Sequence, residues 1–147
     1  MAQTNTYKRA KKQAQPQIDT SLGHLPPQSV EVEKRVLGAL MIDVDAFTVV
    51  SELLRPETFY DPKHQKIFHA IQQLNIMEVP VDFVSVIEQL KKEGTHDEVG
   101  APTYIIELTD SVASSANIEY HARVLAQKYV ARQLISYAST IEGKAFD

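Results

Sequence analysis

Helical spacing of apolar residues is the feature that most constrains how this chain folds. In the stretch VPVDFVSVIEQLKKEG, Asp82 precedes and Gly94 follows an apolar face made of Phe83, Val86, Ile87 and Leu90. An aspartate accepts hydrogen bonds from the first free backbone N–H groups of a helix, and a glycine adopts the left-handed conformation beyond its end. No sustained alternation of apolar and polar residues indicates a β-strand, so the sequence predicts an all-α fold.

The stretch PPQSVEVEKRVLGALMID, residues 26–43, predicts an earlier helix of the same kind. Ser29 follows two prolines and is suited to cap it, while Glu31 and Glu33 lie near the positive end of the helix dipole. The apolar residues of this helix recur every four positions. Gly38 lies beside that stripe and would allow another backbone to come close.

Further helix starts follow along the chain. Asp43 is expected to cap a second helix that ends before Pro56. Asp61 with Pro62 marks the start of a third helix, because a proline at the first helical position costs no hydrogen bond. The apolar stripe of the third helix comprises Ile67, Phe68, Ile71 and Leu74. Another short helix is expected from about Pro102.

These signals divide the chain into three parts. Residues 1–25 are polar and rich in glutamine, and are expected to form a disordered basic tail. The charged residues of this tail are Lys8, Arg9, Lys11, Lys12 and Asp19. Residues 26–116 are expected to form a small helical bundle, called the head below. Residues 117–147 are expected to form one long helix, which begins after Asn117 and runs to about Glu142.

The two halves of the long helix carry different apolar faces. The first half is expected to pack on the head through Ile118, Ala122, Leu125 and Tyr129. The second half has four apolar residues at the 4-3-4 spacing of a coiled-coil seam, and these are Val130, Leu134, Tyr137 and Ile141. We expect these four residues, called the seam below, to be covered by a later helix or by another copy of the chain. The alternative is one long core helix that the chain itself encloses.

Motifs for chemistry are absent from the sequence. It contains no phosphate-binding loop, no nucleophile elbow and no cysteine, and its five histidines lack ligand spacing. We therefore predict no catalytic residue, no metal site and no cofactor site in this chain, which leaves a scaffold or binding module. No apolar run reaches the ~20 residues of a membrane helix, and no signal peptide is recognisable. A cytoplasmic protein without membrane contact is expected.

Several sequence blocks in fixed order resemble the N-terminal domain of bacterial replicative DNA helicases of the DnaB family. The blocks are PPQSVEVEKRVLGALMID, LLRPETFYDPKHQKIFHAI, PVDFVSVIEQL and ANIEYHARVLAQKYVARQLI, and the resemblance covers about residues 25–147. Two places depart from the family's usual pattern. Gly100 is followed by Ala101 and a proline where a glycine pair is common, and His121 precedes Ala122 where a tyrosine is common.

The resemblance implies a helical head followed by a helical hairpin, of which residues 117–147 would be the first arm. It implies that hairpins pair between subunits, that six such domains form a collar on a ring hexamer, and that primase docks on this collar. A helicase loader is a further implied partner. The parent protein would be an ATP-dependent DNA helicase whose ring encloses DNA and whose motor, with its ATP and Mg²⁺, lies beyond this chain. This chain would then be a truncated fragment without enzymatic activity.

Other classes of function stay open on the residues alone. The basic tail is suited to contact nucleic acid phosphates, whereas the rest of the chain carries more acidic than basic residues and suits that task poorly. A nucleic-acid-binding module acting through this tail is therefore the alternative to an assembly and docking domain. A flexible, solubilising arm is the simpler interpretation of the same residues. A third interpretation, an unrecognised small enzyme, requires a pocket with convergent polar groups.

Overall fold

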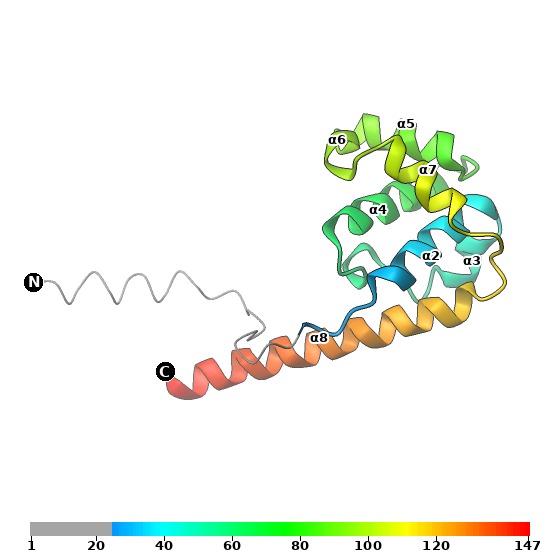
Figure 1. The fold of residues 1–147 in the computed structure, drawn as a ribbon. Coiled ribbons are helices and arrows are strands. Elements are labelled where there is room, and N and C mark those ends of the chain that lie inside the picture. The colour runs from blue at the N-terminus through cyan, green and yellow to red at the C-terminus, as the bar shows by residue number, and fades with distance from the viewer. Residues whose placement is uncertain (1–24) are drawn as a thin grey trace, which may run out of the picture. The chain divides into compact units, whose positions relative to one another are not determined.

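The computed structural model of this protein describes residues 25–147, and every regular element in that range is a helix (Figure 1). The elements are, in chain order, α2 (Val30–Ile42), α3 (Ala46–Val50), the 3₁₀ helix η2 (Pro56–Thr58), α4 (Pro62–Ile76), α5 (Phe83–Glu93), α6 (His96–Val99), α7 (Thr103–Asp110) and α8 (Ile118–Phe146). The prediction of an all-α fold is therefore confirmed. The predicted disordered basic tail lies outside the described residues, apart from its last residue.

The head packs two pairs of helices around one apolar core. Helix α2 lies against α7 and helix α4 lies against α5, and α2 also contacts α4 (Figure 1). The core is filled by fully buried side chains from all four helices, among them Leu37, Ile67, Phe68, Leu90 and Ile105. The ring centres of Phe59 and Phe68 lie 5.0 Å apart, so the segment before α4 also contributes to this core.

Three helix ends are capped as the sequence predicts. Asp82 accepts a hydrogen bond from Ser85 N at 2.8 Å, while the Ser85 hydroxyl accepts one from Asp82 N at 3.0 Å. At the start of α4, Asp61 accepts a hydrogen bond from Lys63 N at 2.9 Å. Gly94 follows α5 with a φ of 74°, in the left-handed region that favours glycine. These predicted boundaries are confirmed.

The predicted side-chain cap at Ser29 is wrong, and Phe83 on the predicted apolar face of α5 is not buried. Ser29 occupies the N-cap position of α2, but its side chain forms no capping hydrogen bond. The Gln28 side chain supplies the acceptor instead, at 3.1 Å from Val30 N. Phe83 is 41% exposed, because it lies in the first turn of α5 and the buried face of that helix begins at Val86.

Asp43 ties the end of α2 to the loop before α8 and does not cap α3, which begins at Ala46. Its Oδ2 accepts a hydrogen bond from the Ser115 hydroxyl at 2.6 Å, and its Oδ1 accepts one from Asp45 N at 2.9 Å. These two bonds, with that of Ser115 the stronger influence, hold the pKa of Asp43 below its ordinary value. The carboxylate therefore joins two segments that are distant in the sequence.

Helix α8 is the long helix that the sequence predicts, and it ends at Phe146 rather than near Glu142. Its first part is buried, as expected, at Ile118, Ala122 and Leu125. A compact unit consequently spans Pro27–Val130 and extends past the predicted division at residue 116. Residues Ala131–Asp147 belong to a second unit, and those up to Phe146 continue the same helix.

Helices α2 and α7 approach each other closely at Gly38. A Cβ atom built at this position would lie closer than 3.0 Å to the Leu108 carbonyl oxygen and to Val112 Cγ2. At such distances van der Waals repulsion forces a neighbour to move, and a backbone carbonyl in a helix has little freedom to do so. The close backbone approach predicted at Gly38 is confirmed, and it sets the spacing of α2 and α7.

Replacing Gly38 with alanine is expected to destabilise the head. The added methyl group meets the α7 backbone, so we expect the free energy of unfolding to fall by about 1–3 kcal/mol. Urea unfolding followed by circular dichroism measures this loss. Gly143→Ala is the matched control, because a Cβ there meets no atom within 4 Å. Equal midpoints for the Gly38→Ala variant and the parent protein would contradict the tight contact.

Candidate functional site

The predicted seam lies on α8, and its four side chains are exposed. The exposed fractions are 55% for Val130, 64% for Leu134, 64% for Tyr137 and 67% for Ile141. None of the four belongs to the core of the head. Full burial of such a side chain is worth about 1.5–3 kcal/mol, so a second helix would gain free energy by covering them. Their pairing with another helix stays a prediction.

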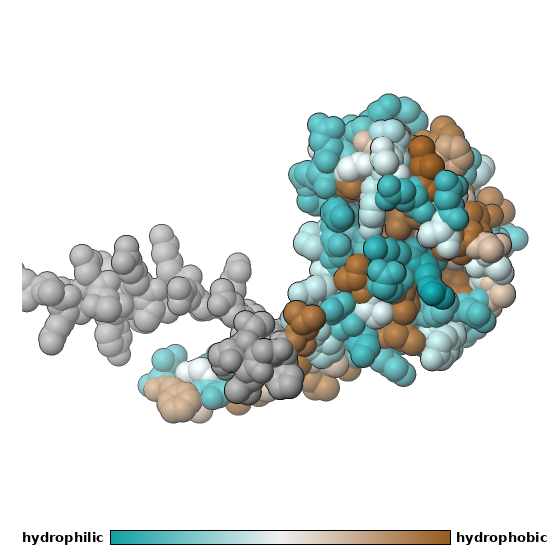
Figure 2. Space-filling view, viewed as in Figure 1, coloured by the Kyte–Doolittle hydropathy of each residue, from teal (hydrophilic) through white to brown (hydrophobic). Residues whose placement is uncertain are grey.

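The head also exposes apolar side chains. Figure 2 shows apolar residues at the surface over α3 and the neighbouring end of α2. Those that are exposed there include Ile42, Val44 and Val49. Single exposed apolar residues are common in folded proteins, whereas a group of them marks a candidate contact surface. Helical periodicity did not single out this group, because its members do not lie on one helical face.

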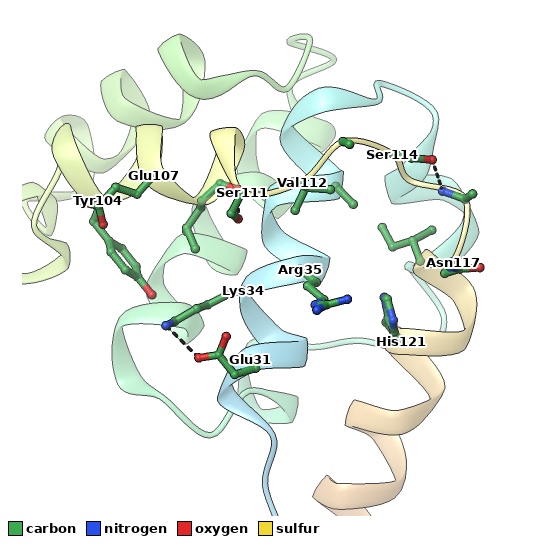
Figure 3. A pocket seen from close by; sticks show the side chains of 15 residues that line it. Glu31, Lys34, Arg35, Tyr104, Glu107, Ser111, Val112, Ser114, Asn117 and His121 are labelled. Carbon is green, nitrogen blue, oxygen red and sulfur yellow. Dashed lines mark hydrogen bonds and ion pairs between the residues drawn. The ribbon is translucent and has the colours of Figure 1, made fainter.

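A groove with a volume of about 540 Å³ lies within the head, where α2, α7 and the start of α8 meet (Figure 3). Its lining includes the buried side chains of Ala39, Leu108 and Ile118, which give it an apolar inner wall. Charged side chains from α2 and α7, the His121 imidazole from α8 and hydroxyl groups from the loop between α7 and α8 form its rim. All of the lining residues belong to the compact unit Pro27–Val130.

Charged side chains make the two ends of the groove different. Figure 3 shows Arg35 and His121 reaching into the space between α2 and α8, whereas Glu107 lies at the other end. Lys34 on the same rim is paired with Glu31, at 3.1 Å from Nζ to Oε1. Among residues 25–147, no ion pair involves Arg35 or His121. The α8 end of the groove therefore carries the Arg35 guanidinium, beside the His121 imidazole, without an acidic partner among the described residues.

A chain of hydrogen bonds inside the head joins Glu33, His64 and Tyr104. Glu33 is 1% exposed and His64 is fully buried. His64 Nδ1 lies 2.8 Å from Glu33 Oε1, and His64 Nε2 lies 2.5 Å from the Tyr104 hydroxyl. Because a carboxylate only accepts hydrogen bonds, Nδ1 donates to Glu33 while Nε2 accepts from the Tyr104 hydroxyl. One polar chain thus links α2, α4 and α7.

The Glu33 carboxylate also holds the turn that precedes α4. Its Oε2 accepts a hydrogen bond from Tyr60 N at 2.8 Å, and its Oε1 accepts one from Asp61 N at 3.2 Å. A buried charge is tolerated only where hydrogen bonds replace the water it has lost. With the bond from His64, three donors from another part of the chain provide that replacement.

Tyr104 acts in this network as a hydrogen-bond donor and not as a nucleophile. Burial, followed by the negative charges of Asp61 and Glu33, raises the pKa of Tyr104 to about 12. The phenol is therefore protonated at neutral pH, whereas a nucleophilic oxygen needs a base or a lowered pKa that removes its proton. Lys63 Nζ lies 4.4 Å from the centre of the Tyr104 ring and adds a cation–π contact. The Tyr104 hydroxyl is therefore not an activated nucleophile at neutral pH.

The network escaped the sequence reasoning, although a signal for it exists. The helix dipole explains why an acidic residue is favourable at the exposed Glu31. It does not explain Glu33, which is buried. Glu33 lies three residues before Val36, and His64 lies three residues before Ile67, so each continues the buried stripe of its helix. Two ionisable residues on the buried faces of different helices indicate a buried pair.

Metal and membrane sites are not found in the part of the chain that the structure describes. No group of three or more His, Cys, Asp or Glu side chains there is arranged to hold a metal ion. No helix in the same range is long and apolar enough to cross a membrane.

Comparison with known proteins finds one consistent similarity. The sequence model of the family described as DnaB-like helicase N terminal domain matches residues 25–127. Two relatives named replicative DNA helicase DnaB are each 44% identical to this chain, over 125 residues in Rhodothermus marinus and over 117 residues in Geobacillus stearothermophilus. These matches cover 85% and 80% of this chain but only 13% and 26% of the two relatives. The chain thus spans a minor part of their length.

A solved structure has the same fold. It is the crystal structure of the N-terminal domain of DnaB helicase from Mycobacterium tuberculosis, with a TM-score of 0.80 and 32% sequence identity. The match covers 84% of this chain and 89% of that chain. Sequence and fold therefore point to the same kind of domain.

Removal of the Glu33 carboxylate is expected to lower the free energy of unfolding by about 1–3 kcal/mol for each buried donor that loses its acceptor. The Glu33→Ala variant leaves His64 Nδ1 and two backbone N–H groups without their acceptor. Thermal and urea unfolding of the purified protein measure the loss.

The matched control for this variant is Glu31→Ala. Glu31 lies on the same turn of α2 but is exposed, and its ion pair with Lys34 is at the surface. Exposed pairs contribute about 0–1 kcal/mol, so this variant should unfold almost like the parent protein. Similar losses in the two variants would refute a special role for Glu33.

Proposed function

Because this chain belongs to the family of DnaB-like helicase N-terminal domains, we propose that it serves as the assembly and docking domain of a replicative DNA helicase. In this role it forms part of a collar on a ring hexamer and offers docking surfaces to other replication proteins. Unwinding of duplex DNA at the replication fork is then the work of a motor domain outside this chain, which uses ATP and Mg²⁺. The contribution of this domain is association with other protein chains.

The exposed seam on α8 is the observation that carries the proposal. Its four residues follow the 4-3-4 spacing that presents apolar side chains to a facing helix, and each is more than half exposed. Large apolar side chains in water cost free energy, which pairing with a second helix recovers. A later helix of the same protein and a helix of another subunit both provide such a cover, and a hairpin that pairs between subunits uses both.

Primase is the partner that we propose for the collar, and a helicase loader is a second one. Relatives 44% identical to this chain are named replicative DNA helicases, and a helicase that holds primase keeps primer synthesis at the fork it opens. DNA would pass through the ring of the whole protein, which we expect in the cytoplasm. The formal net charge of −4 suits this chain to contacts with proteins better than to contacts with phosphates.

Charges placed in the seam are expected to weaken self-association. A Leu134→Asp, Ile141→Asp double variant puts two carboxylates where apolar contacts are needed, and each 1.4 kcal/mol lost weakens association about tenfold. In the full-length helicase, light scattering should show a fall from hexamer mass to smaller species. Sedimentation of this chain alone at high concentration should show dimers for the parent protein and monomers for the variant.

Ser139→Asp provides the control for the seam. Ser139 lies on the opposite side of α8 from the seam, so the same added charge should leave the hexamer intact. An unchanged hexamer mass for the double variant would contradict the role of the seam in assembly.

Docking of primase is expected to appear as saturable heat when the C-terminal domain of primase from the same organism is titrated into this protein. The reason is that the collar function requires a surface on this domain that binds without the motor. Primase that lacks its C-terminal domain serves as the control and should give no heat. Absence of binding by a folded sample, verified by circular dichroism, would refute the docking part of the proposal.

A further inference from the structure

We propose that the groove between α2, α7 and the start of α8 docks an acidic peptide segment of a partner protein, whose carboxylate binds between Arg35 and His121. This inference rests on the proposed docking function and adds the chemistry of the docked segment. The segment carries aspartate or glutamate next to a large apolar residue. The apolar residue enters the groove, and the acidic residue fixes its direction.

The size and lining of the groove suit an apolar side chain. Its volume of about 540 Å³ lies within the range of about 300–1,000 Å³ that is typical of binding pockets. Its lining is mixed, because the largely buried side chains of Ala39, Leu108 and Ile118 form an apolar floor while the polar rim supplies more of the surface. An apolar side chain that reaches this floor loses contact with water, which favours binding.

The positive charge of Arg35 lies at the α8 end of the groove, and no acidic side chain within residues 25–147 pairs with it. Arg35 from α2 and His121 from α8 both line this end, and neither forms an ion pair within residues 25–147 (Figure 3). The N-terminal end of α8 adds the partial positive charge of the helix dipole. Lys34, the remaining cation of the rim, is neutralised by Glu31. A carboxylate supplied from outside is therefore complementary to this end.

The opposite end of the groove sets the orientation of the segment. Glu107 lines that end, and among residues 25–147 it takes part in no ion pair. A second carboxylate placed near Glu107 would be repelled, so an acidic segment gains most when its charge lies at the α8 end. The Tyr104 side chain, held by His64, forms a fixed wall beside Glu107. A preformed wall reduces the entropy lost on binding.

Selection from a phage library of random peptides tests this chemistry without knowledge of the partner. Peptides selected on the parent protein are expected to be enriched in aspartate or glutamate within a few positions of a leucine, isoleucine, phenylalanine or methionine. On the Arg35→Glu variant the enrichment should shift to lysine and arginine, because the charge at the docking position is reversed. Selected peptides without acidic enrichment, or an enrichment unaltered by Arg35→Glu, would overturn the proposal.

Binding of the best selected peptide, measured by fluorescence polarisation, gives the size of the effect. Arg35→Glu is expected to weaken it about tenfold, and rising salt should weaken it in the parent protein by screening the charges. Arg123→Glu is the matched control, because Arg123 is an exposed arginine that pairs with Glu119 and does not line the groove. Equal losses for both variants would show that only general charge attraction is involved and would overturn the proposal.

A second measurement is independent of substitutions and places the peptide on the protein. Amide shifts in nuclear magnetic resonance spectra of the labelled protein should change most at Ser111–Ile118 and around Arg35 when the peptide is added. Changes centred on Leu134 and Ile141 would place the peptide on the seam and overturn the groove proposal.

The groove proposal and the proposed function fail in different ways. Primase binding that Arg35→Glu leaves unaltered, together with loss of acidic selection, overturns the groove proposal and leaves the docking role intact. If acidic peptides bind in the groove but the protein does not bind primase, the groove proposal is supported and the docked segment does not come from primase.

Discussion

Burial of the Glu33 carboxylate is the constraint on which the arrangement of the head depends. A charge inside a protein must find its partners there, and those of Glu33 come from the turn before α4 and from His64 in α4. His64 in turn binds Tyr104 on α7. Hydrogen bonds are directional, whereas apolar packing tolerates small shifts between helices. The polar chain therefore fixes how α2, α4 and α7 are placed in a way that the apolar core alone would not.

The same arrangement creates the groove. Helices α2 and α7 lie so close at Gly38 that no side chain fits between them, and the groove opens beside this contact, where α8 begins. Tyr104 belongs to both features, since its hydroxyl ends the polar chain and its side chain lines the groove. Docking at the groove therefore takes place against a surface whose position the interior has already set, which lowers the entropy that binding costs.

Two surfaces of different physical character follow from this fold. The seam on α8 is apolar and periodic, and contacts of this type are typical of permanent subunit interfaces. The groove combines an apolar floor with an arginine that forms no ion pair within residues 25–147, and contacts of that type form quickly, respond to salt and select among partners. In the proposed role, the domain thus has one surface for its own subunits and another for proteins that come and go at the replication fork.

The sequence by itself determined where most helices begin and end, the all-α class and the family, because caps, prolines and apolar periodicity act between residues a few positions apart. Asp82 and Gly94 show this for α5, whereas the exposed Phe83 shows its limit, since periodicity identifies a face without saying how far a neighbour covers it. Only the tertiary structure decided that Glu33, His64 and Tyr104 form one chain and that Arg35 faces His121 across a groove. Partners 31 and 40 positions apart meet only when the helices pack, and no local rule records that packing.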